Sequence, residues 1–110
     1  MPVVVHSRKA VPELLDIFRS STLDPSRFVF HCFTEPPELA KQVIDFGAWI
    51  SLTGVVTFKG APEVAEASDL IPIDRLMVET DAPFLAPAPH RKVWPNEPKY
   101  VTHVAAFLAD

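Results

Sequence analysis

The chain has 110 residues, of which 48% are hydrophobic and 22% are charged, a composition typical of one globular domain with an apolar core. Its apolar runs are too short to span a membrane, and residues 1–8 lack the charged start and long apolar region of a signal peptide. The formal charge of −4 argues against a broad electrostatic surface for nucleic acid, and the single cysteine excludes an internal disulfide. We therefore expect a cytoplasmic protein with no membrane partner.

Short apolar runs alternate with segments of helical spacing along the whole chain. We predict four strands, at residues 2–6, 28–32, 48–52 and 76–78. Each run is β-branched or otherwise apolar on both faces, which is typical of a buried parallel strand. We predict four helices, at residues 10–20, 36–46, 62–70 and 97–109. Gly47 fits the C-terminal cap of the second helix, and Asn96 fits the N-cap of the last.

This strand–helix alternation predicts an α/β fold with a parallel sheet and right-handed crossovers. Two architectures agree with four such units. One is a small open sheet with helices on both faces. The other is half of a (β/α)₈ barrel, since a complete barrel normally needs about 250 residues.

Three of the four predicted strands end in a residue that can bind a metal ion: His6, His31 and Asp81. The carboxyl ends of parallel strands share one rim, and imidazole nitrogens with carboxylate oxygens suit Zn²⁺, Mn²⁺ or Mg²⁺. Taken singly, each residue has an ordinary structural interpretation: a histidine after a strand is more often hydrogen-bonded than metal-bound, and Glu79 and Asp81 could cap the following loop. The shared chemistry of three separate strand ends favours a metal site.

Several segments in the chain carry a family resemblance. They are P-V-V-V-H-S-R (2–8), H-C-F-T (31–34), I-S-L-T-G-V-V-T-F-K (50–59), R-L-M-V-E-T-D-A-P-F-L-A-P (75–87) and N-E-P-K-Y-V (96–101). In this order they resemble the C-terminal half of TatD-family metal-dependent hydrolases, often called TatD DNases. The resemblance covers nearly the whole chain. It implies that residues 1–110 form a single partial domain, with four βα units as strands five to eight of a TIM (β/α)₈ barrel.

The resemblance also implies roles for individual residues. His6 and His31 match metal ligands, and Asp81 matches a catalytic aspartate that binds metal and handles the proton of the attacking water. The implied reaction is hydrolysis of phosphodiester bonds in DNA, or at RNA ends, by a metal-activated water. Strand alternation directs Glu79 to the same side as Asp81, so we expect Glu79 to orient the metal ligands through hydrogen bonds.

Three cations lie nearest the predicted rim: Arg8, Lys59 and Arg91. We expect them to contact substrate phosphates, because arginine in particular grips phosphate oxygens with two hydrogen bonds. The alternative for each is a solvated loop charge.

The chain also departs from the family pattern. The family carries a His-x-His pair on its first strand and a bridging glutamate on its fourth, and this sequence contains neither. Four strands alone would leave two open edges, so we expect a homo-oligomer or an N-terminal half-barrel partner. Three hypotheses remain: a TatD-like phosphodiesterase, a non-catalytic half-barrel subunit that needs a partner, or a hydrolase of another ester or amide.

Overall fold

A computed structural model, which describes residues 1–110, contains one four-stranded parallel sheet. Its strands are β1 (Val3–His6), β2 (Phe28–His31), β3 (Trp49–Leu52) and β4 (Leu76–Val78). They lie side by side in chain order, and each pairs in parallel with the next. The predicted parallel βα arrangement is confirmed, with strand boundaries within one residue of those expected.

The helices are α1 (Val11–Arg19), α2 (Pro37–Phe46), α3 (Pro62–Ser68) and α4 (Val101–Ala109), with 3₁₀ turns η1 (Pro25–Arg27), η2 (Gly54–Thr57), η3 (Ile73–Arg75) and η4 (Pro98–Tyr100). Gly47 ends α2 with φ +103°, a left-handed conformation that glycine adopts without steric cost, as the sequence predicted. The predicted last helix is wrong at its start. Because η4 precedes α4, Asn96 does not cap that helix. None of the helices is long and apolar enough to cross a bilayer.

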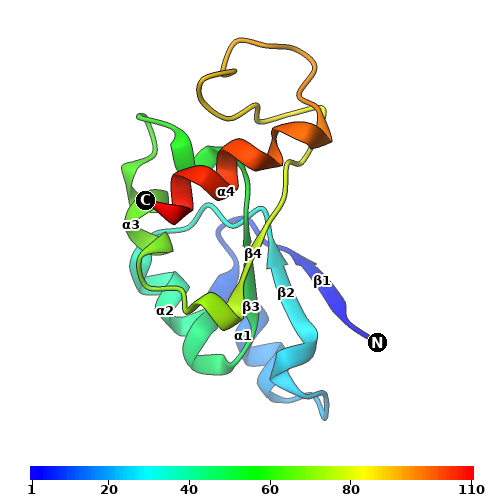
Figure 1. Ribbon diagram of the computed structural model, residues 1–110. Helices are drawn as coiled ribbons and strands as arrows, with labels where there is room; N and C mark the ends of the chain where they lie inside the picture. Colours follow the sequence, from blue (N-terminus) through cyan, green and yellow to red (C-terminus); the bar gives the residue numbers. More distant parts are fainter.

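The core lies between one face of the sheet and the helices (Figure 1). Alternate strand residues Phe28, Phe30, Ile50 and Leu52 are buried on this face. They meet apolar side chains of the first three helices, which include Val11, Leu15, Val43 and Val64. This packing follows from the helical spacing of apolar residues in each connecting segment.

The opposite face of the sheet has no helix over it. Val4 in β1, whose side chain lies on this face, is 70% exposed. The outer edges of β1 and β4 are unpaired within the chain. A sheet covered on a single face, with four βα units in chain order, corresponds to half of a barrel and not to a sheet with helices on both faces.

The carboxyl ends of the strands point toward the end of the molecule that carries the proline-rich loop, drawn in yellow to orange in Figure 1. This loop, residues 82–97, crosses close over η2. A Cβ atom at Gly54 would overlap the carbonyl oxygen of Leu85 and the backbone of Pro87, so glycine is required for this approach. Thr57 Oγ1 also accepts a hydrogen bond from the Ala88 backbone N–H at 2.9 Å.

Candidate metal centre at the rim of the sheet

Two histidines meet at the carboxyl ends of β1 and β2. His6 and His31 are register partners in the parallel ladder, so both rings leave the sheet on the same side. His6 Nδ1 lies 3.2 Å from His31 Nε2, within hydrogen-bond distance. Two imidazole nitrogens bound to one tetrahedral Zn²⁺ at their usual bond length would be about 3.3 Å apart. A direct hydrogen bond between the rings and two ligands of one ion therefore both agree with this spacing.

Glu79 lies against the same pair from the end of β4. One carboxylate oxygen, Oε2, is 3.7 Å from His31 Nδ1, and the other accepts a hydrogen bond from the Cys32 backbone N–H. The Glu79 backbone N–H donates to the Leu52 carbonyl at 2.9 Å, which continues the β3–β4 pairing one residue past the strand. A carboxylate held in this way can fix the ring orientation of His31 and favour its binding to a cation.

Asp81 is held at the rim by a left-handed backbone turn. Its φ is +54°, and its carbonyl accepts a hydrogen bond from the Phe84 backbone N–H at 3.0 Å. Cys32, directly after His31, has a similar φ of +49°. Such conformations cost energy in residues other than glycine, and they often accompany functional sites. The structure does not bring Asp81 together with the two histidines: no group of three or more His, Cys, Asp or Glu side chains is placed to hold one ion.

The residues present thus fit a metal ion in part. Two nitrogen donors lie at a suitable distance from each other and the Glu79 carboxylate lies close by, but this chain does not assemble a complete ligand set. Ser7, directly after His6, has a buried hydroxyl with no hydrogen-bond partner in the chain. Buried polar atoms of this kind are normally satisfied by water or ligand.

Cys32 is half-buried beside this centre. Burial raises the pKa of its thiol, and the hydrogen bond with Thr53 opposes this effect. The nearby carboxylates of Asp81 and Glu79 raise the pKa further. A thiol that stays protonated is a poor nucleophile and a poor metal ligand, so the chemistry of this rim rests on its imidazoles and carboxylates.

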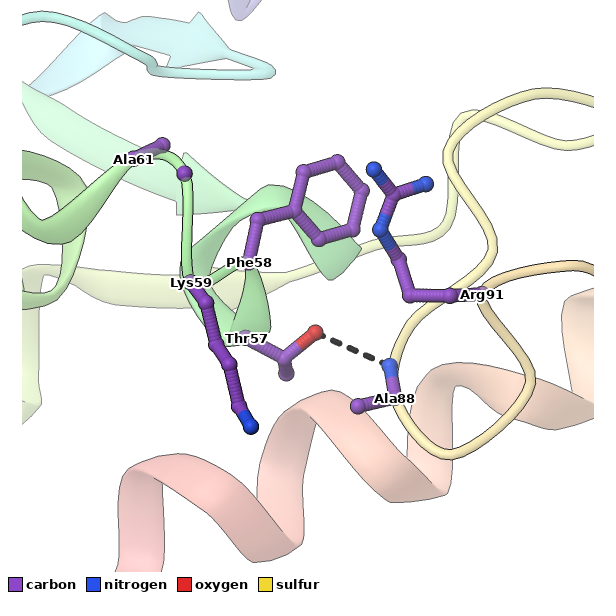
Figure 2. A pocket seen from close by; sticks show the side chains of 7 residues that line it. Thr57, Phe58, Lys59, Ala61, Ala88 and Arg91 are labelled. Carbon is purple, nitrogen blue, oxygen red and sulfur yellow. Dashed lines mark hydrogen bonds between the residues drawn. The ribbon is translucent and has the colours of Figure 1, made fainter.

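The three predicted phosphate contacts take different positions. Arg8 is exposed in the loop after β1. Lys59 and Arg91 both line a pocket of about 510 Å³ between η2 and the proline-rich loop. Figure 2 shows the Arg91 guanidinium beside the Phe58 ring, at 3.7 Å from its centre, whereas Lys59 extends away from that pair. The structure therefore brings Lys59 and Arg91 to one pocket and leaves Arg8 apart.

Two features of the loop were not found from the sequence. Asn96 is buried, and its side-chain amide donates to the carbonyls of Thr80 and Phe84, at 3.1 and 2.7 Å. His90 and His103 form a second histidine pair, with their Nε2 atoms 3.1 Å apart. The sequence predicted Asn96 as a helix cap and not as a residue whose side chain holds the loop. No spacing rule links a loop histidine to a helix 13 residues away.

Comparison with known proteins supports the family resemblance over the full chain. The family model described as TatD related DNase matches residues 1–110. The chain is 44% identical over 108 residues to the metal-dependent hydrolase YcfH of Escherichia coli K12, and 38% identical over 109 residues to the metal-dependent hydrolase TatD of Mycobacterium tuberculosis. These matches cover 98% and 99% of this chain and 40% of each relative, so the chain spans about 40% of the length of the curated relatives it matches.

The fold comparison agrees with the sequence comparison. The crystal structure of YJJV, a TatD homolog from Escherichia coli K12, superposes with a TM-score of 0.88 at 28% sequence identity. The match covers 99% of this chain and 41% of that one. Four parallel βα units that superpose on about two-fifths of such a protein are a half-barrel. On both comparisons, this chain belongs to the TatD-related DNase family.

Proposed function

We propose that this chain carries one half of the catalytic rim of a metal-dependent phosphodiesterase that acts on DNA or on RNA ends. The observation that carries this proposal is the His6–His31 pair, whose nitrogens lie 3.2 Å apart at the ends of two neighbouring parallel strands in a TatD-family chain. A bound divalent ion, Mg²⁺, Mn²⁺ or Zn²⁺, would supply a hydroxide nucleophile near neutral pH and polarise the phosphoryl oxygen.

Each rim residue has a proposed part in this reaction. His6 and His31 hold the ion through their ring nitrogens, and Glu79 orients His31 from its position 3.7 Å away. Asp81, in the turn after β4, is proposed to take the proton of the attacking water once the rim is complete. A carboxylate within hydrogen-bond reach of that water can act as its general base.

Two groups near the rim favour a nucleic acid over a small ester as the substrate. Phe84 and Trp94 of the proline-rich loop are 57% and 68% exposed, with ring centres 5.7 Å apart. Exposed aromatic rings are stacking surfaces for unpaired bases. Lys59 and Arg91, around their shared pocket, would contact the phosphates of the same strand, and exposed Arg8 would do so from the loop after β1.

The open face of the sheet calls for a partner. We propose that four further βα units cover it, supplied either by a second copy of this chain or by an N-terminal half-barrel that carries the family's His-x-His pair and glutamate. Either partner would pair the free edges of β1 and β4, and the N-terminal half-barrel would also complete the ligand set of the ion. A non-catalytic subunit is the remaining alternative, and it predicts binding of the partner without cleavage. A cytoplasmic location stays a prediction from the single, unpaired cysteine.

A nuclease assay tests this function. End-labelled single-stranded DNA is incubated with Mg²⁺ or Mn²⁺ and either the wild-type chain or its Asp81→Asn variant, each alone and each mixed with the separately produced N-terminal half of YcfH. In the mixture with the half-barrel we expect metal-dependent cleavage by the wild-type chain. This cleavage should fall by about 10²–10⁴-fold in Asp81→Asn, because the proton acceptor is lost. Cleavage that survives metal chelation, or that is equal in the variant, would contradict the proposal. Binding of the half-barrel without any cleavage would favour the non-catalytic subunit.

A further inference from the structure

A second pair of histidines lies away from the rim, between the proline-rich loop and the last helix. His90 belongs to the loop and His103 to α4. Their Nε2 atoms are 3.1 Å apart, their ring centres are 4.7 Å apart, and their planes are inclined by 62°. Both rings are partly exposed, so a hydrated ion can reach them from solvent.

The separation of these rings agrees with chelation of one ion. Two imidazoles bound through Nε2 to one ion, at the usual Zn–N bond length, would place nitrogens 3.1 Å apart at a bond angle of about 100°. In that arrangement the ring centres would be about 4.8 Å apart, against the observed 4.7 Å. Two rings joined head-on by a linear hydrogen bond would have centres about 5.4 Å apart. The rim pair, with centres at 5.3 Å, lies between these two arrangements.

The surroundings hold both rings in place. Tyr100, one helical turn before His103, stacks on His90 with ring centres 4.4 Å apart and planes inclined by 19°. The backbone of His90 is tied on both sides: its N–H donates to the Pro87 carbonyl at 2.7 Å, and its carbonyl accepts from the Val93 N–H at 2.8 Å. Ligands that are already oriented lose little conformational freedom on binding.

The two positive side chains next to this histidine pair both contact other groups. Arg91, next to His90 in the chain, places its guanidinium over the Phe58 ring at 3.7 Å. Lys99, next to Tyr100, forms an ion pair with Glu97 at 3.1 Å. Both of these positive groups are thus engaged with partners of their own.

We propose that His90 and His103 form a second metal site, distinct from the rim, for a late first-row divalent ion such as Zn²⁺. The protein supplies two nitrogen ligands, and water completes the coordination. Such ions are preferred over Mg²⁺ or Mn²⁺ because imidazole nitrogen suits the former and oxygen ligands suit the latter. A metal ion binds both Nε2 atoms only when neither carries a proton. In the hydrogen-bonded pair one ring carries a proton on Nε2, and on metal binding this proton moves to Nδ1 of the same ring. A pair of neutral histidines therefore releases no net proton.

This site would join the proline-rich loop to α4. Ala88 and Arg91, on either side of His90 in the chain, line the pocket that also contains Lys59. An ion bound at His90 and His103 therefore orders the loop segment that presents Arg91. It also stabilises the folded chain, because it binds the folded state in preference to the unfolded one.

The test uses the full 110-residue chain with the changes His6→Gln and His31→Gln, which remove the rim pair. The sequence has four histidines, so His90 and His103 are the only ones that remain. Zn²⁺ is titrated into this double variant by calorimetry. We expect one saturable site and a rise in Tm with Zn²⁺ but not with Mg²⁺. A further His103→Gln or His90→Gln change should weaken Zn²⁺ binding at least tenfold, whereas Tyr100→Phe, which keeps the stacked ring, should leave it unchanged.

Two results would overturn the proposal: no saturable Zn²⁺ site in the double variant, or equal affinity after His103→Gln in a chain whose circular dichroism is unchanged. Should a glutamine variant fail to fold, NMR of the ¹⁵N-histidine-labelled double variant decides the matter without further substitution. Zn²⁺ should then shift the Nε2 resonances of both remaining histidines together at one equivalent. A shift of one histidine alone, or of neither, would exclude a shared site.

Discussion

His6 and His31 are register partners at the ends of β1 and β2, and this pairing brings their ring nitrogens to 3.2 Å. A shift of either strand by one residue would send one histidine to the helical face of the sheet. The apolar residues of the same strands prevent that shift. Phe28 and Phe30 are buried against the helices, so residues 29 and 31 must face the other way. The packing of the core thus fixes the geometry of the candidate metal centre.

We expect the charge of Glu79 to favour metal binding and its hydrogen bond with the Cys32 N–H to stabilise the fold. Glu79→Gln keeps an acceptor for the Cys32 N–H but removes the negative charge beside His31. We expect it to weaken binding of a divalent ion at the rim about 10–100-fold with little change in stability. Glu79→Ala should weaken binding similarly and also lower the free energy of unfolding by about 1–3 kcal/mol, because the Cys32 N–H loses its partner. Calorimetry and urea unfolding measure the two effects. Equal stability of the two variants would contradict this division of roles.

Gly54 is expected to control the position of the proline-rich loop. A Cβ atom there would overlap the Leu85 carbonyl and the Pro87 backbone, which cannot move aside without shifting the loop. We expect Gly54→Ala to lower the free energy of unfolding by about 1–3 kcal/mol, as overpacking does elsewhere. Gly60→Ala is the matched control, since a Cβ at Gly60 meets no atom within 4 Å. Thermal unfolding of the two variants tests this, and an equal Tm for both would refute the close approach.

Asn96 is expected to stabilise the loop and not the last helix. It is 3% exposed, its amide donates to the carbonyls of Thr80 and Phe84, and its Oδ1 accepts from the Glu97 N–H. Asn96→Ala removes these bonds and should cost about 2–3 kcal/mol of unfolding free energy. Thr102→Ala, which removes one exposed hydrogen bond to the Lys99 carbonyl, should have little effect. Hydrogen exchange locates the change: faster exchange confined to α4, with the loop unaffected, would indicate a helix cap after all.

The uncovered face of the sheet is expected to drive association. Val4 is 70% exposed on this face, and a strand edge lies beside it. We expect the wild-type chain to sediment as a dimer or larger species, or to bind an N-terminal half-barrel, because both the edge and the apolar face gain from burial. Val4→Lys should weaken that association. Leu23→Lys, at an exposed site in the turn after α1, should not. A wild-type chain that stays a stable monomer at high concentration would contradict this prediction.

The strands and their order could be predicted from the sequence because they depend on local pattern. The runs V-V-V-H and F-V-F-H have the composition of buried parallel strands, and parallel strands place their carboxyl ends at one rim. The meeting of His6 and His31 follows from those two facts. Periodicity alone left two architectures open, because it does not say whether the second face of the sheet is covered. The family resemblance in the sequence predicted the half-barrel, and the structure confirms it.

The loop contacts could not be predicted, because they depend on the path of a segment without periodic structure. Asn96 has the residue type of a helix cap, yet the turn η4 separates it from α4 and its amide points back to Thr80 and Phe84. The pairing of His90 with His103 likewise depends on how the loop folds over the helix. Asp81 lies at a predicted strand end, but its left-handed turn, which no propensity rule foresaw, sets where its carboxylate points.

The most direct test of the account measures metal binding at the rim alone. In a chain with His90→Gln and His103→Gln, only His6 and His31 remain as histidines. Mn²⁺ and Zn²⁺ are titrated by calorimetry into this chain and into the same chain with His31→Gln. We predict one bound ion, with affinity at least tenfold weaker once His31 is replaced. Equal affinity with and without His31 would contradict the claim that the paired strand ends form a metal centre.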